Sequence, residues 1–354
     1  MPATSTEPQS NRQSALASAG RDISGAVHLG SPLRRGALII VRSNKSAVSL
    51  SIIVLAVVLL FRAHGFAASA NLQPLAITVA VAAVVGWAQT AALSIGHFNL
   101  AVGAVGGVTG MFLGWLLQDA HVELALGIVA SLAFGVALGL VQGALVAYSG
   151  INPFVVSLGL ASVFTGGMLV LSQSNSFSSL PSAFVALGRN TVFGVPLLFY
   201  VALGIGAIFA VQMNAALLGR RLIATGANPR AAALSGISVR QAILSAHALS
   251  GLLAAAAGIM LAAELGSSQP YGGNDWLLGS FAAPVLGGTL LSGGRVSVLG
   301  TLLGACFLSL IDNGLIILGV NSYWYQVFLG GIILIAIGLE RGRLSLLGRR
   351  QWVR

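Results

Sequence analysis

The sequence predicts an all-α, polytopic membrane protein with about ten transmembrane helices, and three observations carry that prediction. Hydrophobic residues make up 56% of the 354-residue chain and charged residues only 7%, whereas soluble domains carry about 25% charged residues. The mean hydropathy is +0.92. Apolar runs of about 20 residues, the length that crosses a bilayer core, recur along the chain.

Three segments are expected along the chain. Residues 1–46 are rich in Ser, Ala, Gln and Arg and lack a periodic apolar pattern, which indicates a disordered cytoplasmic tail. Residues 47–340 form the membrane domain, and residues 341–354 form a basic cytoplasmic tail. The first apolar run begins too far into the chain for a cleaved signal peptide. The spans are expected near 47–61, 72–93, 100–117, 122–148, 153–173, 195–214, 241–262, 276–291, 297–318 and 324–339.

Ten spans place both termini on one side, and the charges indicate which side. Sixteen of the 18 Lys and Arg residues lie in the two tails, in the 215–240 loop or at Arg295. Only Arg62 and Arg189 fall on the other side. The acids expected on that other side are Asp119, Glu123, Glu264 and Asp275. By the positive-inside rule, the tails and the 215–240 loop are therefore expected in the cytoplasm.

The 215–240 loop contains a helix signal of its own. Asn228 followed by Pro229 is typical of an N-cap and a first helical position. A short Ala-rich helix should follow to Leu234 and stop near Gly236. A capped helix on a basic loop between two spans indicates a docking element for a cytoplasmic partner. An ordinary positive-inside loop is the alternative.

Three polar or Gly-rich stretches interrupt the helical pattern: Ser94–Gly107, Gly266–Asp275 and Gly287–Arg295. Broken helices inside membrane proteins are where substrate paths are built. The second interruption follows the first by five spans, an offset that would invert it. Repeated GxxxG spacings, such as that of Gly135 and Gly139, predict a tightly packed bundle.

No chemistry of catalysis is visible. The single lysine, Lys45, has no preceding GxxxxG, so a phosphate-binding P-loop is excluded and any ATP hydrolysis must come from another polypeptide. The single Cys306 lies in an apolar span, and the histidines are scattered, so we expect no metal, no cofactor and no catalytic residue in this chain. Asp312 lies inside a span, where a charge costs ~2.5–3.5 kcal/mol. It must face the bundle interior, as a path residue or as a polar lock between helices.

The chain resembles the membrane permeases of bacterial monosaccharide ABC importers of the ribose, xylose and arabinose type. The resemblance covers residues 70–340, and its densest motifs are GANPRAAALSGISVRQ, SGLLAAAAGIMLAAELGSSQP and APVLGGTLLSGGRVSVLGTLLGACFLSLIDNGLIILGV. The same superfamily includes branched-chain amino acid permeases, whose SLGHxxF pattern is echoed by Ser94–Phe98. The later motifs favour the sugar branch.

This resemblance implies an ABC importer permease fold and a set of partners. Two permease copies, or a permease and a paralogue, would sit on two cytoplasmic ATPase subunits that bind ATP and Mg²⁺. A periplasmic or lipid-anchored solute-binding protein would deliver the solute to the loops at 174–194 and 263–275. The positions that match the ATPase-coupling motif are Gly226, Asn228, Pro229, Ala231, Ala232, Ser235 and Gly236.

Two departures from the family pattern concern the interior. Asn99 stands where the family commonly has an aspartate, and Thr165 stands where it commonly has an arginine. We hypothesise that the two side chains approach each other, which requires Ser94–Gly103 to be unwound inside the membrane. The candidate translocation-path residues are His97, Asn99, Gln142, Thr165, Asp312 and Asn313.

Two other functions stay open from the sequence. One is a permease for branched-chain amino acids or another small polar solute. The other is an ion- or proton-coupled secondary carrier, which would need carboxylates inside the membrane. Of the acids in the chain, only Asp312 meets that requirement in the sequence.

Overall fold

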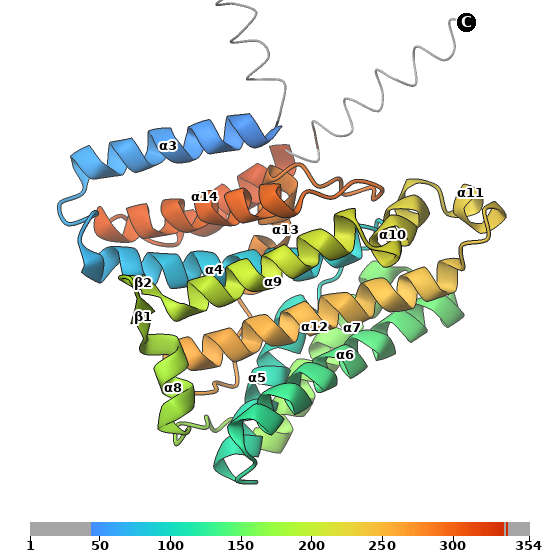
Figure 1. Cartoon of the computed structure of the whole chain (residues 1–354), viewed down its shortest axis with the longest axis horizontal. Coiled ribbons are helices and arrows are strands. Elements are labelled where there is room, and N and C mark those ends of the chain that lie inside the picture. The colour runs from blue at the N-terminus through green and yellow to red at the C-terminus, as the bar shows by residue number, and fades with distance from the viewer. Residues whose placement is uncertain (1–43, 336–337, 339–354) are drawn as a thin grey trace, which may run out of the picture. The chain divides into compact units, whose positions relative to one another are not determined.

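The computed structural model describes residues 44–335 and 338, and most of these residues are helical (Figure 1). The longer helices are α3 (Asn44–Arg62), α4 (Ser69–Leu93), α5 (Val102–Gln118), α6 (Leu124–Ser149), α7 (Pro153–Ser172), α9 (Leu197–Asn214), α12 (Val239–Leu265), α13 (Trp276–Leu286) and α14 (Val298–Ile317). A further apolar helix covers Trp324–Ile335. The shorter elements are α8 (Ser182–Arg189), the strands β1 (Thr191–Val192) and β2 (Val195–Pro196), α10 (Leu217–Ala227) and α11 (Pro229–Leu234).

Each expected span corresponds to one of these apolar helices. Six helices, α4, α6, α7, α9, α12 and α14, are long and apolar enough to cross a membrane. Shorter apolar helices occupy the other four expected positions. The predicted all-α, polytopic membrane fold is thereby confirmed. The expected tails lie outside the described residues, except that residues 44–46 already belong to α3.

Two expected helix boundaries were wrong. The span expected over 276–291 ends at Leu286, and Gly288 just beyond it adopts a φ of +87°, which stops a helix. The first interruption, expected over Ser94–Gly107, is non-helical only as far as Ala101, and α5 begins at Val102. The other two interruptions are non-helical as expected.

Helix α4 lies at the centre of the core, and α12 packs against it and against α5 and α6. The second half of α4 is almost completely buried. Glycines let α6 and α12 approach closely. A Cβ added at Gly251 would lie 2.2 Å from the carbonyl oxygen of Gly135, and one added at Gly139 would lie 2.3 Å from that of His247. The tight glycine packing predicted from the sequence is confirmed.

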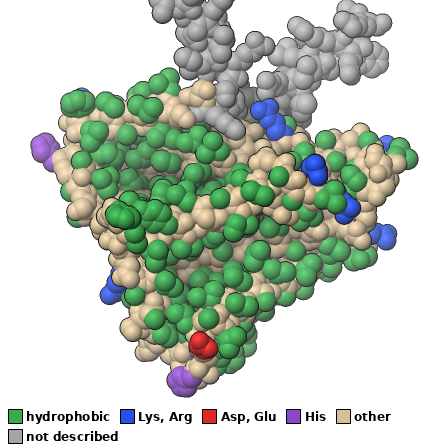
Figure 2. Space-filling view, viewed as in Figure 1, with side chains coloured by type: hydrophobic (Ala, Val, Ile, Leu, Met, Phe, Trp, Pro, Cys, Tyr) green, Lys and Arg blue, Asp and Glu red, His purple; other side chains and the backbone are tan. Residues whose placement is uncertain are grey.

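The long helices run between two ends of the bundle (Figure 1). We call the end that carries α8, β1 and β2 the α8 end, and the end that carries α10 and α11 the α11 end. Figure 2 shows most of the visible Lys and Arg side chains at the α11 end, with hydrophobic side chains spread over the helices between. Many of these hydrophobic side chains are exposed, such as Phe61 (84%) and Leu171 (88%), as expected where helices face lipid.

Candidate functional site

The predicted capped helix of the central loop is present as α11. The Asn228 Oδ1 accepts a hydrogen bond from the backbone N–H of Ala231 at 3.0 Å, and Pro229 occupies the first helical position. Gly236, with a φ of +80°, ends the turn that follows. The short Ala-rich helix expected from Asn228 to Gly236 is confirmed.

Helix α11 presents an exposed face at the α11 end. Leu234 is 92% exposed, and the neighbouring Arg230, Ala231 and Ser235 are also exposed. Ser235 is held by its own helix, because its hydroxyl donates to the carbonyl oxygen of Ala231 at 3.0 Å. Leu234 and Arg230 are therefore accessible to a partner protein at this end.

Two residues of the predicted coupling set lie on the inner side of this element. Ala232 is only 4% exposed. A Cβ added at Gly226 would lie 2.0 Å from the carbonyl oxygen of Ser94 and 2.6 Å from the backbone nitrogen of Gly294. Those two turns are themselves joined, because the Gly294 N–H donates to the Ser94 oxygen at 3.0 Å. Gly226 therefore lets α10 rest on two of the three interruptions.

The unwound stretch at residues 94–101 is held from inside by the Asn99 side chain, which is 3% exposed. Its Nδ2 donates to the Ser250 Oγ at 2.9 Å. Its Oδ1 accepts from the Gln142 Nε2 and from the Ala101 N–H, each at 2.9 Å. The Gln89 side-chain nitrogen donates to the backbone carbonyl oxygen of Asn99 at 2.8 Å, and the Gln89 side-chain oxygen accepts from the Asn99 backbone N–H at 3.2 Å. Four separate segments therefore meet at one asparagine.

A histidine pair lies beside this network. The Nδ1 of His97 and the Nε2 of His247 are 3.2 Å apart although the residues are 150 positions apart in the chain. His247 is fully buried, and its Nδ1 has no hydrogen-bond partner. Sequence reasoning missed this pair because neither histidine has another nearby in the chain. No local spacing signals such a contact.

Thr165 lies away from the Asn99 network. It is on α7, which approaches the unwound stretch where the Ser157 Oγ donates to the Phe98 carbonyl at 3.3 Å. Thr165 is eight residues further along α7, or about 12 Å along the helix axis. Among residues 44–335, no hydrogen bond joins Thr165 to Asn99. The hypothesised approach of these two side chains is not found, because Asn99 turns toward α6 and α12.

The neighbours Asp312 and Asn313 face different surroundings near the end of α14. Asn313 forms two reciprocal amide hydrogen bonds with Asn71 at the start of α4, at 2.7 and 3.2 Å. This pair joins two helices, as expected of a structural lock. Asp312 instead lines a pocket together with Glu264 and Asp275.

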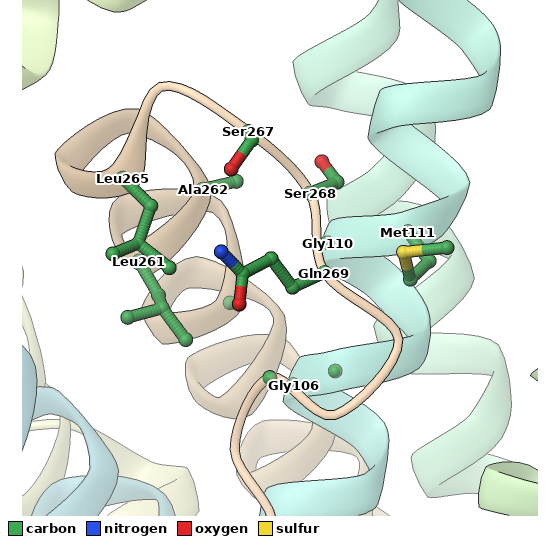
Figure 3. A pocket seen from close by; sticks show the side chains of 12 residues that line it. Gly106, Gly110, Met111, Leu261, Ala262, Leu265, Ser267, Ser268 and Gln269 are labelled. Atoms are coloured by element: carbon green, nitrogen blue, oxygen red, sulfur yellow. The ribbon is translucent and has the colours of Figure 1, made fainter. Parts of the chain in front are cut away.

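Asp275 reaches that pocket because the 266–275 loop enters the bundle from the end of α12. Figure 3 shows the first part of this loop passing alongside α5. A Cβ added at Gly114 would meet Ser268, and one added at Gly103 would lie 2.1 Å from the carbonyl oxygen of Gly273. The loop thus follows α5 for about 16 Å, the length of eleven helical residues. Bare glycines on α5 therefore let the loop lie against this helix, and Asp275 at the end of the loop stays exposed.

The polar groups inside the bundle are suited to binding a polar molecule through hydrogen bonds. The cluster around Asn99 consists of amides, hydroxyls and imidazoles, which donate and accept hydrogen bonds. In the described part of the chain, no group of three or more His, Cys, Asp or Glu side chains is placed to hold a metal ion. The space between α5, α12 and the loop is tightly closed, with a volume of only about 10 Å³.

Comparison with known proteins gives a consistent result. Residues 71–337 match the family model described as "Branched-chain amino acid transport system / permease component". The ribose import permease protein RbsC of Bacillus subtilis (strain 168) is 32% identical over 294 residues, which cover 82% of this chain and 91% of the relative. The D-allose transport system permease protein AlsC of Escherichia coli (strain K12) is 30% identical over 276 residues, which cover 78% and 85%.

A third relative spans nearly the whole chain. The fructose import permease protein FrcC of Rhizobium meliloti is 27% identical over 361 residues, which cover 99% of this chain and 98% of the relative. No solved structure matches the chain. The chain therefore belongs to the family of ABC importer permeases that includes the ribose and D-allose permeases.

Proposed function

We propose that this chain is the permease subunit of a bacterial ABC importer and that it moves a monosaccharide, or a similar small polar solute, across the inner membrane. The observation that carries the proposal is α11, a capped and exposed helix between two spans, in a chain whose relatives are named for ribose, D-allose and fructose. The family description is broad enough to include branched-chain amino acid permeases. The sugar names of the relatives favour the sugar branch.

The charge distribution supports one orientation. Sixteen of the 18 Lys and Arg residues belong to the tails, the central loop or Arg295. By the positive-inside rule, the α11 end and both termini then face the cytoplasm, and the α8 end faces the periplasm.

The partners follow from this orientation. A separate ATPase subunit would bind ATP and Mg²⁺ and dock on the exposed face of α11, because the chain has no P-loop of its own. A solute-binding protein would dock at the α8 end. A second permease copy or a paralogue would complete the path. In this assembly Asn228 and Pro229 shape the docking helix, while Gly226 and Ala232 support it from within.

The test replaces Leu234, the large exposed apolar side chain on α11, in the full chain co-expressed with its ATPase. We expect Leu234→Asp to abolish co-purification of the ATPase and solute-stimulated ATP hydrolysis, because a charge would replace the apolar contact. Phe193→Asp is the matched control for co-purification of the ATPase, since Phe193 is 98% exposed and lies in the turn between β1 and β2 at the opposite end. Its φ of +51° is tolerated by aspartate.

Both variants should reach the membrane in normal amount. Retention of the ATPase by Leu234→Asp, or its equal loss in both variants, would contradict docking on α11. Ala232→Arg is not a clean test, because Ala232 is buried and arginine would disturb the fold itself.

A further inference from the structure

A pocket of about 260 Å³ lies among α4, α12, α13, α14 and the helix at 324–335. Its wall includes the carboxylates of Glu264, Asp275 and Asp312 and the aromatic side chains of Trp276 and Tyr325. Pockets for drug-sized ligands measure about 300–1,000 Å³. This pocket is therefore of a size for a smaller molecule, such as a single sugar ring.

The polar groups of the wall are dominated by hydrogen-bond acceptors. Among the described residues, no Lys, Arg or His lines the pocket, and Glu264, Asp275 and Asp312 have no hydrogen-bond donor or cation as a partner. The charges of Asp275 and Asp312 repel each other. Ionised carboxylates only accept hydrogen bonds. A molecule that binds here without opposing the wall must bring donors and must not bring a negative charge.

A second observation, independent of the charges, also indicates a ligand. Ser309 lines the pocket and is only 3% exposed, yet its hydroxyl has no hydrogen-bond partner within the described part of the chain. It lies three residues before Asp312 and so on the same face of α14. The hydroxyl oxygen is accessible from the pocket, so water or a ligand can reach it. A ligand hydroxyl in the pocket would supply the missing partner.

We propose that this pocket binds the transported solute and selects neutral polyhydroxyl molecules, such as monosaccharides, over anionic ones. The inference rests on the proposed function and adds the residues that would bind the solute and the exclusion of anions. Sugar hydroxyls would donate to the three carboxylates and pair with Ser309, and Trp276 would cover an apolar face of the ring. The carboxylate of a sugar acid or of an amino acid would instead meet the negative wall.

The position of Trp276 is set by its packing in the bundle. The Trp276 ring packs on Gly106 of α5, where an added Cβ would lie 2.6 Å from the ring. Glu264 lies one residue before the end of α12, toward the α8 end. The pocket therefore lies toward the side from which a solute-binding protein would deliver the solute.

A cysteine reporter tests the proposal in the full chain, purified in detergent. The chain has one cysteine, Cys306, so Cys306→Ser gives a background without thiols. Gly279 lines the pocket, and a Cβ added there meets nothing within 4 Å, so Gly279→Cys places a thiol in the wall without strain. The reagents are the trimethylammonioethyl and the sulfonatoethyl methanethiosulfonates, which differ in the sign of their charge.

The measured quantity is the labelling rate of the cationic reagent divided by that of the anionic reagent. We expect this ratio to be larger at Gly279→Cys than for a small thiol in solution, by on the order of tenfold or more. Saturating D-ribose, D-allose or D-fructose should slow the labelling severalfold. D-galacturonate at the same concentration should not protect the thiol, because its carboxylate would face the acidic wall.

Matched charge variants locate the cause. Replacing Glu264 with Gln and both Asp275 and Asp312 with Asn should return the reagent preference to that of the small thiol and weaken protection by sugar. Replacing Glu123 with Gln and Asp119 with Asn neutralises acids elsewhere in the chain and should leave both readouts unchanged. Circular dichroism would confirm equal helix content in all variants.

Three results would overturn the proposal: equal protection by D-galacturonate, no protection by any of the three sugars, or protection by Na⁺ or K⁺ alone. The last would assign the pocket to a cation. None of these results affects co-purification of the ATPase through Leu234, so the two proposals can fail separately.

Discussion

Replacement of Asn99 tests how the unwound stretch at residues 94–101 is held. Asn99→Leu keeps a similar side-chain size but removes all hydrogen bonding. It leaves the Gln142 Nε2, the Ser250 Oγ and the Ala101 N–H without their partner. Asn99, Gln142 and Ser250 are 3%, 1% and 0% exposed, so water cannot readily replace the lost bonds.

The expected loss follows from these three groups. A buried polar group left without a partner costs about 1–3 kcal/mol, although side-chain hydrogen bonds within membrane proteins average about 0.6 kcal/mol. For three groups, we therefore expect Asn99→Leu to lower the free energy of unfolding by about 2 kcal/mol at the lower figure and by up to about 9 kcal/mol at the upper one. Gln142→Leu removes only one of these bonds to Asn99, so its loss should be about a third as large.

Asn99→Asp should be much better tolerated, by less than about 2 kcal/mol. A carboxylate can accept from the same amide and backbone donors, and the Ser250 hydroxyl can rotate to donate to it. The residue also lies just before the first turn of α5, where a negative charge is favoured by about 0.3–1 kcal/mol. If Asn99 faced Thr165, an aspartate at position 99 would lack the arginine that the family commonly has at position 165, and Asn99→Asp would be destabilising. The structure instead gives Asn99 the partners Gln142 and Ser250.

Unfolding in mixed micelles with increasing dodecyl sulfate, followed by far-ultraviolet circular dichroism, measures these free energies. A wild-type unfolding midpoint for Asn99→Leu would refute the reasoning. So would a loss for Asn99→Asp as large as that for Asn99→Leu.

Three further predictions follow from named contacts. Gly226→Val should abolish folding or transport, because its Cβ would lie 2.0 Å from the Ser94 oxygen. Gly204→Val on α9 is the control and should be tolerated, because a Cβ there meets nothing within 4 Å. Membrane yield and solute uptake are measured for both variants. Asn313→Leu should lower the unfolding midpoint without changing transport kinetics. Adding Asn71→Leu should recover part of the loss, which a double-mutant cycle detects. An altered transport constant would contradict a purely structural role of the Asn71–Asn313 pair. The purified chain alone should hydrolyse no ATP above background in a phosphate-release assay, and activity that survives repurification would contradict a separate ATPase.

The features that the sequence predicted are local ones. The α11 helix follows from Asn228, Pro229 and Gly236. These residues lie close together in the chain and define the start of the helix and the turn that ends it. The apolar helices follow from runs of residues whose length matches a bilayer. The interruptions at residues 94–101, 266–275 and 287–295 are rich in Gly and polar residues, which weaken helices without tertiary help.

The features that the sequence could not predict join distant segments. The contact between His97 and His247 and the network around Asn99 depend on which helices become neighbours, and no spacing along the chain encodes that. The path of the 266–275 loop has a different cause. The loop lies against α5 because α5 presents glycines such as Gly103 to it, and the GxxxG pattern does not say whether a helix or a loop fills the groove.

The three interruptions are connected to one another through backbone contacts at glycines, and this has a mechanical consequence. Helix α10 rests on Ser94 through Gly226, and the stretch that begins there leads into α5. Gly103 of α5 then touches the carbonyl of Gly273, next to Trp276 in the wall of the acidic pocket. Closely packed backbone cannot absorb a displacement as a flexible side chain can. A movement imposed on α11 should therefore reach the pocket wall along a continuous path of backbone contacts.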